Sequence, residues 1–227
     1  MDSLEIFRLI LNVFELAAAI TGFIYWYKIK NSYWKWFPFL LSFLFITEMT
    51  AKFIRWEGSY KTTVPLLYKY INIPAMFIVL IWLMGKELKD TKWKKLPFEL
   101  ITIYLLNFIA ETLFFDAAFS RFGSLSYQTG CIAILILAIF CFNKLVTDKE
   151  IIHFKRSLHF WVSLGVVSYL VTTVPYMAFR NSLFKFNYEL GVSLWYVTMF
   201  LNFIMYSCFI IGFILYKPEL TPQHAKN

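Results

Sequence analysis

Three glutamates lie inside long apolar stretches of this sequence, where an ionised carboxylate is costly unless it has a partner. Glu15 lies in LNVFELAAAITGF, Glu48 lies in FITEMTAKF, and Glu111 follows NFIA. Such a carboxylate can bind a cation, take part in proton transfer, or hold neighbouring helices together. Lys52 follows Glu48 by four residues, and this acid-first order favours an interaction along one face of a helix.

Six side chains are candidates for binding a ligand or an ion: three glutamates, two lysines and one asparagine. They are Glu15, Glu48, Lys52, Lys69, Asn107 and Glu111. The alternative role is structural, because polar pairs hold membrane helices together and long basic side chains extend from a span to the membrane interface. For Arg55, which lies at the end of its apolar run, we expect the interfacial role.

Common catalytic and metal-binding motifs are absent from the sequence. It contains no GxSxG, HExxH, GxGxxG or GxxxxGK[ST] pattern. The histidines are His153, His159 and His224, and the cysteines are Cys131, Cys141 and Cys208. The odd number of cysteines, without a CxxC pair, indicates neither a disulfide framework nor a thiolate metal site. We therefore expect no catalytic residue among the common types and no bound metal.

The composition is that of a membrane protein. Hydrophobic residues make up 59% of the 227 residues, and aromatic residues make up 21%, whereas soluble domains are roughly 45–50% apolar. In a soluble protein the net charge of +8 would suggest nucleic acid as a partner. Here the lysines and arginines cluster between apolar runs, as expected of membrane loops, so we expect no nucleic-acid partner.

The sequence predicts an all-α polytopic membrane protein, with residues 1–227 forming a single domain of seven transmembrane helices. The spans are expected near residues 6–27, 36–56, 64–84, 97–118, 124–145, 158–180 and 192–216. Each can cross about 30 Å of hydrocarbon at about 1.5 Å per residue. A membrane-spanning strand would need only about 10 residues and would alternate in polarity.

Loops rich in lysine and arginine alternate along the chain with loops that contain fewer of these residues. This alternation predicts the orientation of the protein in the membrane. The loops rich in lysine and arginine are KIKNSYWK, GKELKDTKWKK and NKLVTDKEIIHFKRS. Because basic loops remain on the cytoplasmic side, the N-terminus is expected outside and the C-terminus in the cytoplasm. The protein is expected in the cell (cytoplasmic) membrane as a multi-pass protein.

In this orientation the polar candidates lie at the middle or in the outer half of the spans. The inner halves are almost entirely apolar, as in FIVLIWLM and ILILAIFCF. A charged residue at the bilayer centre costs roughly 2.5–3.5 kcal/mol on insertion scales, which disfavours a position facing lipid. We therefore expect a cavity inside the bundle, open to the outside and lined by Glu48, Lys52, Lys69 and Glu111. A kink at Pro175 would help to shape it.

Three functional hypotheses follow in order of preference. The first is a non-enzymatic sensor or receptor-like protein that binds a small polar or charged ligand from outside and signals to a cytoplasmic partner. The second is a transporter or channel for a small solute or cation, including an oligomeric pore-type effector, in which the glutamates bind the cargo. The third is an intramembrane enzyme that uses carboxylates.

The number of spans, the outside N-terminus and the length are similar to those of microbial rhodopsins. That family carries retinal on a lysine in the middle of span seven, whereas residues 192–216 contain no lysine. We therefore expect no retinal and no other cofactor. The expected partners are the lipid bilayer, an unknown small ligand, a cytoplasmic protein at the basic loops and further copies of the same chain.

Overall fold

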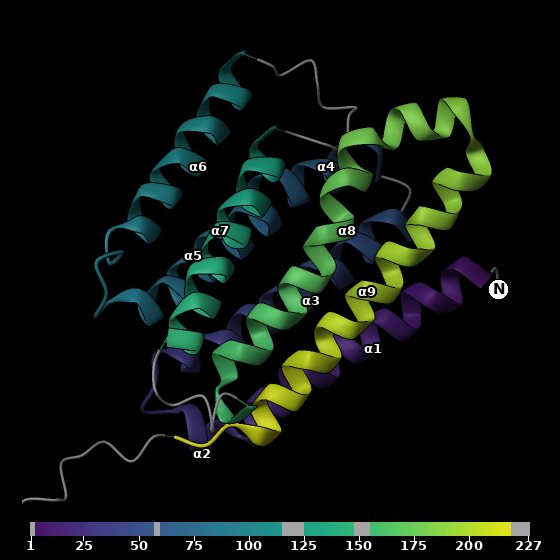
Figure 1. Cartoon of the computed structure of the whole chain (residues 1–227). Helices are drawn as coiled ribbons and strands as arrows, with labels where there is room; N and C mark the ends of the chain where they lie inside the picture. Colours follow the sequence, from purple (N-terminus) through teal and green to yellow (C-terminus); the bar gives the residue numbers. More distant parts are fainter. Residues whose placement is uncertain (1–2, 57–59, 115–124, 148–154, 219–227) are drawn as a thin grey trace, which may run out of the picture.

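A computed structural model describes residues 3–56, 60–114, 125–147 and 155–218, and every regular element within these ranges is helical (Figure 1). The elements are α1 (Ser3–Ile24), α2 (Trp26–Ile29), η1 (Tyr33–Lys35), α3 (Trp36–Trp56), α4 (Tyr60–Leu67), η2 (Tyr68–Asn72), α5 (Ile73–Gly85), η3 (Lys86–Leu88), α6 (Leu96–Phe114), α7 (Leu125–Thr147), α8 (Leu158–Phe186) and α9 (Tyr188–Leu215).

Seven stretches of helix are long and apolar enough to cross a membrane. They cover Ile6–Ile24, Tyr33–Trp56, Thr63–Leu88, Leu96–Phe114, Leu125–Leu145, Leu158–Arg180 and Tyr188–Leu215. The predicted all-α fold and its seven apolar helices are thus confirmed for the described part of the chain. The third of these stretches is composite: α4, a π-helical turn η2 and α5 follow one another without a loop.

The predicted connection between the last two spans is much shorter in the structure. Helix α8 continues to Phe186, α9 begins at Tyr188, and Asn187 alone separates them. The Asn187 backbone is extended, and its side chain accepts a hydrogen bond from the Leu190 backbone N–H at 3.0 Å. This is an N-cap, which satisfies one of the free N–H groups at the start of a helix. The polar residues that suggested a loop therefore extend two helices.

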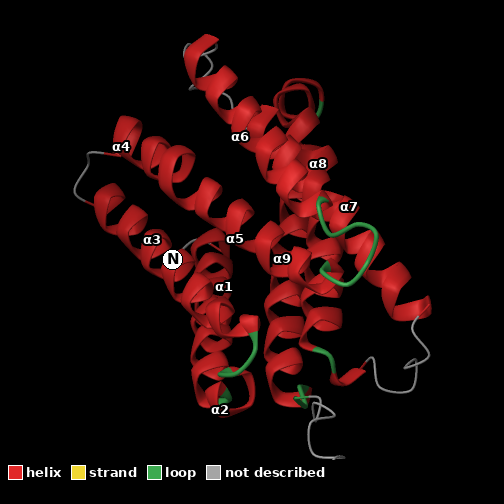
Figure 2. Cartoon of the chain, turned by 90° about the vertical axis from the view of Figure 1, so that its left-hand side faces the viewer, coloured by secondary structure: helices red, strands yellow, loops and turns green. Residues whose placement is uncertain are grey.

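Six of the long helices form a closed ring. Helix α1 packs against α3, α3 against α5, α5 against α7, α7 against α8, α8 against α9, and α9 against α1. Helix α6 lies beside this ring, where it packs against α5 and α7 (Figures 1 and 2). Its Phe98, Leu106, Leu113 and Phe114 side chains are largely exposed, as expected for side chains that face lipid.

The two ends of the bundle differ in charge. At the end called here the basic end, α2 lies beside the start of α8 and the end of α9 (Figure 1). Here η1 contacts η3 through Tyr33 and Glu87, and it contacts the start of α8 through Trp34 and His159. The Lys28 Nζ atom donates to the Ile214 carbonyl at 2.7 Å, and the Lys144 Nζ atom donates to the Glu87 carbonyl at 2.7 Å. The opposite end, where α1 begins, is called the N-terminal end.

The hydrophobic core lies mainly in the half of the bundle nearer the basic end. Phe37, Phe77, Ile81, Met84 and Phe213 are almost completely buried there. Glycines allow close packing in this region: a Cβ atom on Gly22 would lie 2.6 Å from the Pro38 side chain. This half is therefore tightly filled, and space remains in the other half.

Candidate functional site: a polar cavity in the N-terminal half

A cavity of about 350 Å³ opens within the ring, in the half nearer the N-terminal end. It is lined by one face each of α1 and α3, by η2 and the start of α5, and by α8 and α9. The α1 side chains that line it include Arg8, Asn12 and Glu15, which recur every three or four residues as expected of one helix face. On α3 the lining charged residues are Glu48 and Arg55, at the two-turn spacing.

The glutamates of the cavity are hydrogen-bonded to tyrosine hydroxyls. The Tyr68 hydroxyl donates to the Glu48 carboxylate, and the Tyr206 hydroxyl contacts the Glu15 carboxylate in the same way. Glu15 is only 5% exposed. Burial of a carboxylate requires such partners, because an unpaired charge in an apolar environment is strongly unfavourable.

Lys52 lies beside the two glutamates and belongs to the same cluster. With the Asn12 carboxamide oriented to satisfy its neighbours, its oxygen accepts from the Lys52 Nζ atom and its nitrogen donates to the Arg8 carbonyl at 3.2 Å. Lys52 also interacts electrostatically with Glu48 and Glu15. The residues from α1 and α3 are therefore joined directly through Asn12 and Lys52.

The π-helical turn η2 positions two polar side chains in the cavity wall. Tyr68 begins this turn and Asn72 ends it. The Asn72 Nδ2 atom donates to the Thr47 hydroxyl at 2.5 Å, which fixes the carboxamide against α3. π-helical turns are rare and occur frequently at functional sites, and Pro74 is the second residue of α5, which follows this turn.

Helices α8 and α9 supply aromatic and amide groups. The Arg8 guanidinium lies over the Trp195 ring, 5.6 Å from its centroid, near the start of α1 and α9. Thr198 and Asn202 lie deeper on α9, about one turn and about two turns beyond Trp195. The Asn202 Oδ1 atom is buried and has no hydrogen-bond partner among the described residues. A buried acceptor of this kind is available to a ligand donor or to water.

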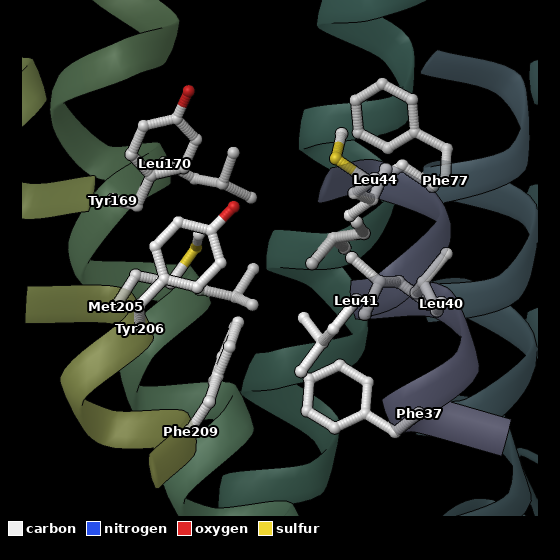
Figure 3. Close-up of a pocket in the computed structure, with 14 residues that line it drawn as sticks. Phe37, Leu40, Leu41, Leu44, Phe77, Tyr169, Leu170, Met205, Tyr206 and Phe209 are labelled. Carbon is white, nitrogen blue, oxygen red and sulfur yellow. The ribbon is translucent and has the colours of Figure 1, made fainter. Parts of the chain in front are cut away.

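A smaller apolar space of about 50 Å³ continues from the cavity toward the basic end. Leu44 and Tyr206 line both spaces. Figure 3 shows Phe37 and Leu41 on one side of it, facing Phe209 on the other. The rings of Phe37 and Phe209 have centroids 5.0 Å apart in an edge-to-face contact. Packed aromatic side chains thus bound the space on the side of the basic end.

The candidates that the sequence suggested divide into two groups. Glu15 and Glu48 line the cavity, and Lys52, which is not itself a lining residue, lies beside them and interacts with both. Asn107 and Glu111 instead face α7, since α6 lies outside the ring: the Asn107 Nδ2 atom donates to the Thr129 hydroxyl at 2.7 Å, and Glu111 accepts from the Ser126 backbone N–H at 2.7 Å. These two polar groups join helices.

Lys69 also does not belong to the residues that line the cavity, although it lies in η2 next to Tyr68. Its Nζ atom lies 5.3 Å from the centroid of the Tyr70 ring. The expected single cavity combined Glu48, Lys52, Lys69 and Glu111, whereas the cavity in the structure is lined mainly by α1, α3, η2, α8 and α9. The tertiary position of α6 is the reason for the difference.

Several lining residues were not among the candidates chosen from the sequence. Arg8, Tyr68, Trp195 and Tyr206 line the cavity. Arginines and aromatic residues near span ends are ordinary interfacial anchors, so their type alone does not reveal a site. One usable signal was the spacing on α1, because Arg8, Asn12 and Glu15 share a face of that helix.

Comparison with known proteins gave no match to a protein-family model, to a curated protein or to a solved structure. Among the described residues there is also no group of three or more histidine, cysteine, aspartate or glutamate side chains that could hold a metal ion. The cavity is therefore the feature of the molecule that points to a function.

Proposed function

We propose that this protein is a non-enzymatic, receptor-like membrane protein that binds a small polar or charged ligand in the cavity among α1, α3, α5, α8 and α9. In the orientation expected from the basic loops, the N-terminal end faces outside and the ligand enters from there. The observation that carries the proposal is a polar, charged cavity whose apolar continuation is bounded by packed aromatic side chains toward the basic end. Such a site can bind a ligand without letting it cross the membrane.

The volume and the lining agree with this proposal. Pockets for small molecules are typically about 300–1,000 Å³ and combine apolar walls with a few placed polar groups. The cavity of about 350 Å³ is lined by Met76, Tyr169 and Met177 as well as by its charged residues. A ligand that draws α1 and α3 toward α8 and α9 would alter the packing of these four helices at the basic end. A cytoplasmic partner bound at that end would detect the change.

Purified protein tests ligand binding directly. A panel of small polar solutes is screened for an increase in melting temperature, since a ligand that binds only the folded protein stabilises it. Glu48→Gln is expected to weaken binding of any hit about tenfold or more, whereas Lys69→Gln, a matched change outside the cavity, should not. If Glu48→Gln leaves every binding event intact, the cavity is not the ligand site.

A second candidate function is transport of the same ligand, in which the present structure is a state open at the N-terminal end. The specific observation that favours it is the apolar space below the cavity, which shares Leu44 and Tyr206 with it. Passage would require the contact between Phe37 and Phe209 to open. Movement of this kind is common in transporters with a site near the membrane midplane.

Proteoliposomes discriminate between the two functions. Flux of a bound solute that Glu48→Gln abolishes, and that Phe37→Ala alters, would establish transport and contradict a purely receptor-like role. Binding without flux, together with a ligand-dependent change in hydrogen exchange over η3 and the residues that follow it, would support the receptor-like role. Hydrogen exchange measures how readily individual backbone amides open to solvent.

A further inference from the structure

Charges in the cavity are arranged in two levels, and the same spacing produces this arrangement on two helices. On α1, Arg8 precedes Glu15 by seven residues, and on α3, Glu48 precedes Arg55 by seven residues. Seven residues are about two helical turns and about 10 Å along the axis. Because α1 runs away from the N-terminal end and α3 runs toward it, both arginines lie near the mouth and both glutamates lie deeper.

The deep level carries a net negative charge in its ionised form. Glu15 and Glu48 line this level and supply two negative charges when ionised. Lys52, which lies between Glu48 and Arg55 on α3, interacts electrostatically with both glutamates and with both arginines. The hydroxyls of Tyr68 and Tyr206 contact these carboxylates without adding charge. The charged residues that line this level are both acidic, which favours a ligand cation there.

Two of the residues that line the mouth, Arg8 and Arg55, are positively charged. The Arg8 guanidinium is held over the Trp195 ring, and Arg55 lies in the last turn of α3. A ligand that bears only a cation would meet these arginines first, and a ligand that bears only an anion would meet the glutamates at the bottom. A ligand with both charges, separated along its length, is attracted at each level.

On the basis of the proposed function, we infer that the ligand is a small zwitterion with an ammonium group and a carboxylate separated by several bonds. Its ammonium group lies deep, between Glu15 and Glu48, beside the hydroxyls of Tyr68 and Tyr206. Its carboxylate lies at the mouth, where the planar guanidinium groups of Arg8 and Arg55 can each bind a carboxylate through two hydrogen bonds. The buried Asn202 Oδ1 atom is a further acceptor for an ammonium proton.

A matched series of probes tests the need for both charges. Binding to the purified full-length protein is measured for 6-aminohexanoate, which carries both charges, and for hexanoate and hexylamine, which carry one each. The expected result is that 6-aminohexanoate binds about tenfold or more tightly than either of the others, because it gains one additional charge-assisted contact. Glycine, in which the charges are adjacent, should bind more weakly than 6-aminohexanoate.

Variants then assign each charge to its level. In Arg55→Gln, 6-aminohexanoate should no longer bind more tightly than hexylamine. In Arg55→Lys most of this difference in affinity should remain. In Glu48→Gln, 6-aminohexanoate should no longer bind more tightly than hexanoate. Glu48→Asp keeps the charge and serves as a second variant. Arg55 is exposed, so its substitution is expected to leave the melting temperature of the free protein unchanged.

The outcomes separate this inference from the proposed function. If hexylamine or hexanoate binds as tightly as 6-aminohexanoate, or if a solute with one charge is the only type of ligand, the zwitterion inference is wrong and ligand binding stands. If no solute in any series binds to the wild-type protein, both the inference and the proposed function are wrong. Loss of all binding in Arg55→Gln, including that of hexylamine, also contradicts the assignment of levels.

Discussion

At the scale of single residues, the structure separates polar groups that look alike in the sequence. Glu15, Glu48 and Glu111 are all glutamates within apolar helices, yet only the first two line the cavity. The Glu111 carboxylate, 7% exposed, accepts the backbone N–H of Ser126 in the first turn of α7. A carboxylate at a helix N-terminus is favourable because free N–H groups and the helix dipole meet it there. Glu111 thus binds the start of a neighbouring helix, whereas Glu15 and Glu48 contact tyrosine hydroxyls in the cavity.

Replacement of Glu111 is therefore expected to affect stability and not ligand binding. Glu111→Leu should lower the free energy of unfolding by about 1–3 kcal/mol, since it removes a hydrogen bond to a charged group. Thermal or SDS denaturation of the purified protein measures the loss. Glu111→Gln, which keeps an acceptor oxygen, serves as the control and should lose less.

A change in ligand affinity without a change in stability would contradict this assignment of Glu111. For Glu48, whose carboxylate lines the cavity, the Gln variant is expected to change ligand affinity more than stability. The two glutamates thus form an internal comparison, in which the same chemical change has different consequences according to position in the fold.

At the scale of secondary-structure elements, α8 and α9 form an antiparallel hairpin that packs along most of its length (Figure 1). Small residues make this approach possible. A Cβ atom added to Gly165 would lie 3.0 Å from the Met205 carbonyl oxygen and 3.0 Å from the Cys208 Cβ atom. Close approach at small residues is a main source of helix association in membranes, where burial of apolar surface gives little driving force.

Gly165→Ala is expected to destabilise the hairpin by about 1–3 kcal/mol, because the added methyl group meets backbone atoms that cannot rotate away. Denaturation of the purified protein measures this effect. Gly191→Ala is the matched control: its Cβ atom would meet only the ring of Phe184, at 3.2 Å, and that side chain can turn. Equal stability of Gly165→Ala and the wild type would show that α8 and α9 do not pack as closely as described.

At the scale of the whole molecule, charge distinguishes the two ends of the bundle. Lys28, Lys86, Lys92, Lys144 and Lys155 all lie in or next to the connections at the basic end. The polar cavity lies in the opposite half. The positive-inside bias then predicts that the cavity opens away from the cytoplasm, which is the direction that a receptor for external ligands requires.

Cysteine labelling in intact cells tests this orientation. Trp56, at the end of α3, is 85% exposed, and Lys92 lies in the exposed connection before α6. A membrane-impermeant maleimide should label Trp56→Cys in intact cells and Lys92→Cys only after permeabilisation. The three native cysteines are buried, which keeps the background low and makes the unmodified protein a suitable control. Labelling of Lys92→Cys in intact cells would reverse the orientation.

Local properties of the sequence determined the helices. The number of apolar runs, their lengths and the charge clusters between them predicted seven helices and most of their boundaries, because each depends on residues close together in the chain. The same reasoning identified Glu15, Glu48 and Lys52, since a charge inside an apolar run is visible without knowledge of the fold.

Tertiary structure alone decided which helix faces meet. In a membrane helix the side toward lipid and the side toward protein are both apolar, so periodicity gives little indication of the inner face. Only the packing places α6 outside the ring, which directs Asn107 and Glu111 to α7. Likewise, only the packing brings Arg8, Tyr68 and Tyr206 from three separate helical segments to one cavity. The glutamates could be recognised from the sequence, but their partners are distant in the chain and are fixed by the fold.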